Sequence, residues 1–148
     1  MKFKIANREI GYSEDPLIIA EIGINHNGNL DQAIAIADSA IQAGAEVLKH
    51  QTHIPDEEMS LEALKVIPGN SKHSIYKIIK KCSLSEIDES KLMKYIISKK
   101  KIFISTPFSK AAVDRLVRFK VPAFKIGSGE WNNLELIEYI CKFKKPII

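Results

Sequence analysis

The sequence of 148 residues has few cysteines, few aromatic residues and no long apolar run. Its two cysteines, Cys82 and Cys141, lack the CxxC spacing of a zinc or redox motif, so we expect two reduced thiols that pack within helices. No apolar run approaches the roughly 20 residues of a membrane span, and the N-terminal MKFKIANREIGY lacks the apolar core of a signal peptide. These absences predict a cytoplasmic protein that does not enter a membrane.

The charge of the chain is nearly balanced, with 22 lysines and arginines against 18 aspartates and glutamates and a net charge of +4. The lysines form small groups at the expected ends of helices, where the helix dipole favours cations. Aromatic residues are not interleaved with them, as they are on many nucleic-acid-binding surfaces. We therefore expect no nucleic-acid partner.

Strand-like and helical stretches alternate along the chain. A small hairpin is expected over residues 2–11, with its turn at Ala6 and Asn7. Apolar runs of strand length begin near residues 17, 46, 101, 123 and 146, with helical patterns between them. Because these runs lack polar alternation, they suit a parallel sheet that is covered on both faces. The sequence therefore predicts the α/β class.

Helix boundaries carry local signals. Asn29, Ser85 and Ser109 each precede a helical pattern and are predicted to be N-caps, because their side chains can accept a hydrogen bond from the first helical turn. Residues 52–71 are polar and contain two prolines and a glycine, which predicts a long irregular loop. Loops of this length in compact domains are usually functional.

The chain ends two residues into the fifth apolar run. We therefore expect residues 1–148 to be the N-terminal portion of a (β/α)8 TIM barrel, comprising strands 1–4 and the start of strand 5. A complete barrel needs about 250 residues. An alternative is a natural truncated product, which acts as a non-catalytic module that binds an anion or another protein.

Polar residues gather at the carboxyl ends of the predicted strands, where parallel α/β folds carry their active sites. Lys125 is predicted to point into a packed interior, where a lysine requires an anionic partner. Gly127 and Gly129 would let backbone N–H groups approach a phosphate. The strand-end residues are Glu21, Asn25, His26, Asn27, Lys49, Gln51, Ser105, Thr106, Lys125, Ser128 and Glu130.

Each of these residues also has a purely structural interpretation. Glu21 and Lys49 could form an ion pair across adjacent strands, and Lys125 could extend to the rim. Ser105 and Thr106 could cap the following loop. For His50 and His26 we favour packing toward the helices and hydrogen bonding within the loop, respectively, over metal binding. Trp131 is expected to pack beside the glycine-rich turn.

The blocks IIAEIGINHNG, EVLKHQTHIPDEEMS, VIPGN, SIYKIIKKC, KIFISTPFS and FKIGSGEWNN occur in this order. Together they resemble the N-acetylneuraminate (sialic acid) synthases, within the wider family of nonulosonate synthases. A different phosphate-binding barrel would share the lysines but would not explain the NHNG and STPFS blocks together. KHQTH and GSGEWNN look more like the sialic acid branch than the legionaminate or pseudaminate branches.

The resemblance implies a (β/α)8 barrel, a C-terminal antifreeze-like domain that is absent here, and a homodimer. It implies condensation of phosphoenolpyruvate with N-acetylmannosamine, assisted by a divalent metal, Mn²⁺ or Mg²⁺, whose ligands lie outside this chain. This fragment alone is expected to be inactive. By the resemblance, the catalytic residues are Glu21, Glu130, Lys49 and Lys125, and the substrate-binding residues are Gln51, Thr106, Ser128 and Asn25.

Overall fold

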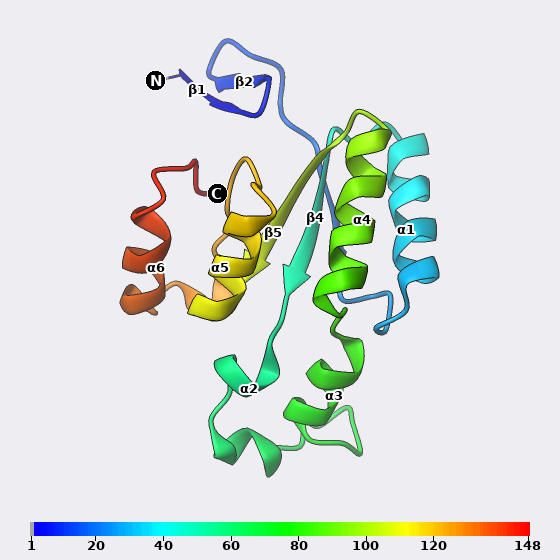
Figure 1. Cartoon of the computed structure of the whole chain (residues 1–148), viewed down its shortest axis with the longest axis vertical. Coiled ribbons are helices and arrows are strands. Elements are labelled where there is room, and N and C mark those ends of the chain that lie inside the picture. Colours follow the sequence, from blue (N-terminus) through cyan, green and yellow to red (C-terminus); the bar gives the residue numbers. More distant parts are fainter. Residues whose placement is uncertain (1) are drawn as a thin grey trace.

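The computed structural model describes residues 2–148, and its centre is a three-stranded parallel sheet (Figure 1). The strands β3 (Ile19–Gly23), β4 (Val47–Thr52) and β5 (Ile102–Pro107) lie side by side in sequence order. Parallel neighbours in sequence order, joined by helical crossovers, are the winding of a barrel segment. The predicted α/β class and parallel sheet are confirmed.

The fourth and fifth predicted strands are shorter than expected. Phe124 forms a parallel bridge with Ser105 on one side and with Ile147 on the other, and neither pairing extends into a strand. The backbone N–H of Ile126 still donates to Ile148 O at 2.9 Å. The pairing is short because the segment leaves the sheet at the turn after Ile126, where the 3-10 helix η2 (Ser128–Glu130) begins.

Four helices cover the outer face of the sheet: α1 (Leu30–Gln42), α4 (Glu86–Ser98), α5 (Lys110–Arg118) and α6 (Leu134–Cys141). In Figure 1, α1 and α4 run side by side on one flank, with α5 and α6 on the other. The three predicted N-caps are confirmed. Asn29 accepts from Gln32 N at 2.9 Å, Ser85 from Asp88 N at 3.1 Å and Ser109 from Ala112 N at 3.2 Å.

The sheet separates two apolar layers. The larger layer lies between the sheet and the helices and includes Leu48 and Phe103, which are at most 2% exposed. The smaller layer lies on the inner face and contains Ile5, Val47, Ile104 and Ala123. Alternate residues of each strand therefore enter opposite layers, as the pleat requires.

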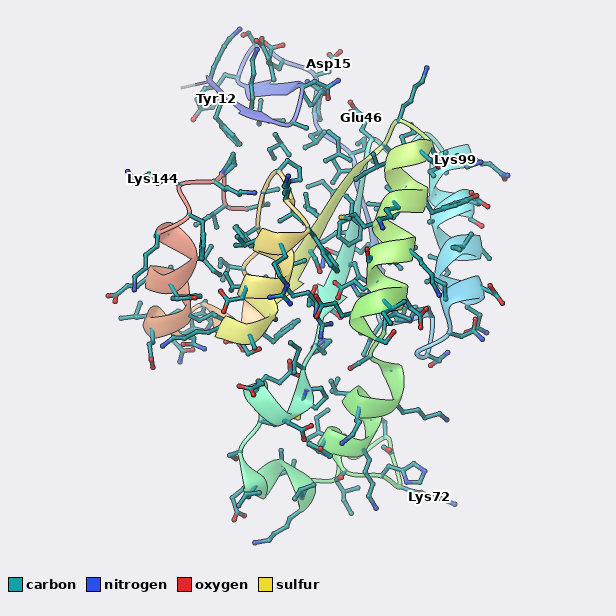
Figure 2. The ribbon with its side chains drawn as sticks, in the orientation of Figure 1. Tyr12, Asp15, Glu46, Lys72, Lys99 and Lys144 are labelled. Atoms are coloured by element: carbon teal, nitrogen blue, oxygen red, sulfur yellow. The ribbon has the colours of Figure 1, made fainter. Side chains whose placement is uncertain are left out.

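The N-terminal hairpin covers the amino ends of the strands (Figure 1). It consists of β1 (Lys2–Ile5) and β2 (Arg8–Gly11), paired antiparallel, with Ala6 in the left-handed region at φ 53°. Arg8 Nε lies 2.9 Å from Glu46 Oε2, which links the hairpin to the residue before β4; Figure 2 shows Glu46 at this end. The predicted hairpin is confirmed, and it leaves the carboxyl ends of the strands as the free end.

Helical turns occupy part of the segment that was predicted to be irregular. Within residues 52–71 the chain forms α2 (Pro55–Glu58) and the 3-10 helix η1 (Leu61–Leu64), and α3 (Ile75–Cys82) follows this segment; all three lie beyond the carboxyl end of β4 (Figure 1). The cause is visible in the sequence, because Pro55 is suited to a first helical position and three acidic residues follow it in the first turn.

Gly28, in the loop after β3, packs against the last turn of α3 and so fixes the end of the excursion, the segment from α2 to α3. It lies in the left-handed region at φ 75°, and a Cβ at this position would be 2.3 Å from the backbone oxygen of Lys81. Glycine is therefore required here by both conformation and space. This contact accounts for the last residue of the NHNG block.

Two smaller expectations from the sequence differ from the structure. Cys82 is half-buried, but Cys141, the last residue of α6, is exposed, so it does not pack in a helix core; both are free thiols. Trp131 is 74% exposed and does not pack beside the turn. Among residues 2–148 no helix is both long and apolar enough to cross a membrane.

Candidate functional site

The carboxyl ends of β4 and β5 place polar side chains on the inner face of the sheet. Lys49 and Gln51 have the same strand parity as Val47, a member of the inner apolar layer, and Thr106 has the parity of Ile104. Gln51 lies opposite Thr106 in the register between the two strands. The inner face is therefore apolar near the hairpin and polar at the free end.

Lys49 is the most buried charged residue of this face. Its side chain is 6% exposed, and Nζ lies 3.5 Å from Glu21 Oε1 on the neighbouring strand. Glu21 is 69% exposed, and it is the one carboxylate within ion-pair distance of Lys49 among the residues that the structure describes. The ion pair that the sequence allowed between these strands is thus present. One long contact to a solvated carboxylate compensates a buried ammonium only in part.

Thr106 carries a hydroxyl without a protein partner. The residue is 1% exposed, and within residues 2–148 its Oγ1 forms no hydrogen bond. A Cβ at Gly127 would lie 3.3 Å from Thr106 Cγ2 and from the Phe108 ring, so the glycine-rich turn sits directly against the end of β5. Buried polar atoms are nearly always paired, so this hydroxyl lacks a partner that such an atom ordinarily has.

Lys125 differs from its prediction. It is half-buried rather than enclosed in a packed interior, and its Nζ donates to the backbone oxygen of Ile126 at 2.8 Å. The residue follows Phe124, whose pairing on both sides is limited to single bridges, and its side chain folds back on its own backbone. Ser128, at the start of η2, is exposed.

Glu130 is oriented by a residue that the sequence reasoning missed. Its Oε2 accepts a hydrogen bond from Asn133 Nδ2 at 2.7 Å, while Asn133 Oδ1 accepts from Leu136 N at 3.1 Å and so caps α6. The signal was available, because an asparagine directly before a helical pattern is a cap candidate. The cap therefore couples the start of α6 to the Glu130 carboxylate.

The side chains of Asn25 and Gln51 both lie beside Gly23. A Cβ on Gly23 would lie 3.6 Å from Gln51 Oε1 and 3.7 Å from Asn25 Nδ2. Asn25 is exposed, and its Nδ2 donates to Ile22 O at 3.0 Å, which closes the turn after β3. The structure thus brings these two predicted site residues together, with Asn25 also serving the local turn.

The outer face of the same strand ends carries a second polar group, the outer polar network, which contains His26, His50, Thr52, Glu89, Ser105 and Arg115. Glu89 of α4 is fully buried. Its Oε1 accepts from Thr52 Oγ1 and lies 3.1 Å from His50 Nδ1, and its Oε2 accepts from Arg115 Nη1 at 3.0 Å. Ser105 Oγ lies 2.7 Å from Thr52 Oγ1.

The proton positions in this network follow from its contacts. Gly28 N–H donates to His26 Nδ1 at 3.2 Å, so the proton of neutral His26 is on Nε2. Nε2 then donates to His50 Nε2 at 3.2 Å, which leaves His50 Nδ1–H to donate to Glu89. His50 thus points toward the helices, and His26 bonds within its loop, as we expected.

Two pKa values reflect this enclosure. Burial, together with the neighbouring His50 ring, lowers the pKa of His26 from 6.5 to about 4. Burial would raise the pKa of the Glu89 carboxyl, but hydrogen bonds from His50, Thr52 and Arg115 outweigh it, so that this pKa lies below its ordinary value. Both shifts favour neutral His26 and ionised Glu89 at pH 7.

Within residues 2–148, no three histidine, cysteine, aspartate or glutamate side chains converge as a metal site requires. His26 and His50 are committed to each other and to Glu89, and Glu21 faces Lys49. The residues present therefore do not form a divalent-metal site, and the expectation that its ligands lie elsewhere stays a prediction.

Comparison with known proteins gives a consistent set of similarities. A model described as the NeuB family matches residues 11–148. The chain is 33% identical to N,N'-diacetyllegionaminic acid synthase of Legionella pneumophila over 142 residues, covering 93% of this chain and 40% of that protein. It is 32% identical to N-acetylneuraminate-9-phosphate synthase of Homo sapiens over 145 residues, covering 95% and 40%.

The fold has solved counterparts. The crystal structure of the spore coat polysaccharide biosynthesis protein SpsE from Bacillus subtilis matches with a TM-score of 0.75 and 33% identity, covering 99% of this chain and 39% of that one. The chain thus spans about 40% of the length of the curated relatives it matches.

Proposed function

The chain belongs to the NeuB family, and from this premise we propose that it forms the first half of the (β/α)8 barrel of a sialic acid synthase, with a phosphoenolpyruvate site on its inner face. The remaining barrel strands, the antifreeze-like domain and the homodimer implied by the resemblance belong to the same proposal. The proposed substrates are phosphoenolpyruvate and N-acetylmannosamine.

One observation supports the anion site above all others: the buried ammonium of Lys49 lies on the same face and strand end as the unpaired hydroxyl of Thr106. Phosphoenolpyruvate carries a phosphate and a carboxylate, which need cations and donors in a partly desolvated place. The Lys49 ammonium has N–H donors beyond the one that faces Glu21, and the Thr106 hydroxyl has an O–H donor without a partner among residues 2–148. Lys125 and Ser128, at the adjoining turn, are proposed to complete the set.

The proposed reaction forms one carbon–carbon bond and exchanges the C2–oxygen bond to phosphate for one to water. C3 of phosphoenolpyruvate attacks the aldehyde carbon of open-chain N-acetylmannosamine, and the aldehyde oxygen takes up a proton. Positive charge develops at C2, and water adds there with loss of a proton, which forms a new C2–O bond. The bond between C2 and the phosphate oxygen then breaks, and the new C2 hydroxyl loses its proton to the departing phosphate to give the keto group. When bound, the divalent metal implied by the family would polarise the aldehyde; residues 2–148 contain no cluster of ligands that would hold it.

Glu130 is the proposed carboxylate at the developing charge on C2. Its orientation by Asn133 supports this role, because a carboxylate held in place stabilises a cation without reorganising. Glu21 is proposed to act at the substrates from the neighbouring strand, with Gln51 and Asn25 as hydrogen-bonding groups for the sugar. A legionaminate or pseudaminate precursor as acceptor is the alternative that the similarity to a legionaminic acid synthase keeps open.

The first test measures phosphoenolpyruvate binding to this chain by calorimetry. Lys49→Met should weaken binding at least tenfold, because it removes the buried cation from the site. Lys77→Met, at an exposed position on α3, is the matched control and should leave the affinity unchanged. Equal affinity of the Lys49 variant and the unaltered chain would contradict the proposed site.

A second measurement separates the enzyme from the non-catalytic module. Phosphate release is followed with phosphoenolpyruvate, N-acetylmannosamine and Mn²⁺, beside a full-length homologue. Turnover only in the longer protein would support a fragment whose metal ligands lie elsewhere. In that longer protein, substituting the carboxylate that corresponds to Glu130 by glutamine should lower turnover far more than it weakens phosphoenolpyruvate binding; an unchanged rate would sink this role.

A further inference from the structure

The outer polar network and the proposed anion site share the same short segments of chain. Each network residue on the sheet is a direct neighbour in sequence of a proposed site residue, and the pleat sends the two side chains to opposite faces. On the strands the neighbouring sets are Lys49–His50–Gln51–Thr52 and Ser105–Thr106, and in the turn after β3 Asn25 and His26 are also adjacent in sequence. A shift of His50, Thr52 or Ser105 would therefore move a site residue with it.

Glu89 joins these segments from outside the sheet. Its two carboxylate oxygens receive Thr52, His50 and Arg115, and the contacts continue to Ser105 through Thr52 and to His26 through His50. A single carboxylate of α4 thereby connects β4, β5, α5 and the loop after β3. The donors and acceptors named here follow one chain of contacts, while Arg115 Nε forms no hydrogen bond within residues 2–148.

We propose that Glu89 is a positioning residue, which holds the carboxyl ends of β4 and β5 so that Lys49, Gln51 and Thr106 converge on one bound anion. The ligand in this inference, phosphoenolpyruvate, rests on the proposed function. The positioning itself does not, because it concerns the strand ends of the unliganded chain.

A merely stabilising role would look different from a positioning role. Loss of packing energy in α4 would raise opening of the whole domain evenly, whereas loss of positioning would loosen the strand ends beyond the change in global stability. Glu89→Gln keeps the shape of the side chain but replaces one accepting carboxylate oxygen by an NH2 group, which cannot accept the hydrogen bond made there. Ile96→Val, in the same helix and fully buried, serves as the control for stability alone.

Thr52 offers an independent pair of variants. Thr52→Val keeps the shape and removes the hydroxyl that bridges Glu89 and Ser105, while Thr52→Ser keeps the hydroxyl. This pair keeps the inference testable should Glu89→Gln fail to fold.

The experiment measures amide hydrogen exchange at Gln51 and Thr106, corrected for global stability from urea unfolding, together with phosphoenolpyruvate affinity. Glu89→Gln and Thr52→Val should speed exchange at both amides at least tenfold beyond Ile96→Val and weaken phosphoenolpyruvate binding at least fivefold. Thr52→Ser should match the unaltered chain in both measurements.

The outcomes separate the two proposals. If the unaltered chain binds no phosphoenolpyruvate, the proposed function of the site fails and the exchange comparison alone decides the positioning role. If exchange at Gln51 and Thr106 rises no more in Glu89→Gln and Thr52→Val than in Ile96→Val, the inference is overturned. It is equally overturned if phosphoenolpyruvate binds and its affinity is unchanged in both variants.

Discussion

The two faces of β4 carry polar side chains in alternation, and they differ in what those side chains meet. On the outer face, His50 and Thr52 are bonded to Glu89 within a buried network. On the inner face, Lys49 has one long contact to an exposed carboxylate, and Thr106 on β5 has none among the described residues. Burial of polar groups is thus compatible with either role, and at these strand positions the two faces differ in whether the buried polar atoms have protein partners.

Removal of the Glu89 side chain should have the largest effect on stability. Glu89→Ala leaves Arg115 and the His50 and Thr52 donors without their acceptor, so we expect the free energy of unfolding to fall by about 3–5 kcal/mol. Lys49→Met, on the inner face of the same sheet, should cause no comparable loss. Urea unfolding measures both, and a similar loss from the two substitutions would remove the distinction between the faces.

Acidification should weaken the outer face next most strongly. Because the pKa of His26 falls from 6.5 to about 4 on folding, the unfolded chain takes up a proton between these pH values and the native chain does not. Stability should therefore fall as the pH drops from 6.5 to 4, by on the order of 3 kcal/mol from this group.

The check is urea unfolding at several pH values from neutral down toward the native pKa of His26, with His26→Gln and His73→Gln compared. The His26 variant should lose most of this pH dependence, while substitution of His73, which is exposed, should leave it in place. Retention of the full slope in His26→Gln would mean that another group titrates.

The smallest effect on stability is expected from replacing a threonine by valine on each face in turn. Thr52→Val removes a hydroxyl bonded to Glu89 and Ser105 and should lower the free energy of unfolding by about 1–3 kcal/mol. Thr106→Val removes a hydroxyl without a protein partner and should change stability by less than about 0.5 kcal/mol. Calorimetry of unfolding gives the comparison, and equal losses would indicate that Thr106 has a structural role after all.

Much of this arrangement could be predicted because its causes are local. The N-caps at Asn29, Ser85 and Ser109 follow from side chains that reach their own helix, and the inward and outward directions of Lys49 and His50 follow from the pleat. The family resemblance added the order of the motifs, which no local rule supplies.

The remaining features depend on contacts between distant segments. Glu89 lies in a helix rich in charged residues, and nothing in its own segment indicates that Thr52, His50 and Arg115 will surround it. The conformation of Lys125 likewise depends on the short pairing of its segment with the segments of Ser105 and Ile147. Periodicity identifies which face a residue occupies, but not whether its polar atoms find partners there.

The close approach of Gly28 to the backbone of Lys81 has a consequence for evolution. The two residues are 53 positions apart in sequence, and the segment between α2 and α3 lies away from both faces of the sheet. Because the end of α3 is fixed at this contact, the segment before it can vary in sequence and length at small entropic cost. Descendants of this chain could therefore diversify that excursion while inheriting the strand ends unchanged.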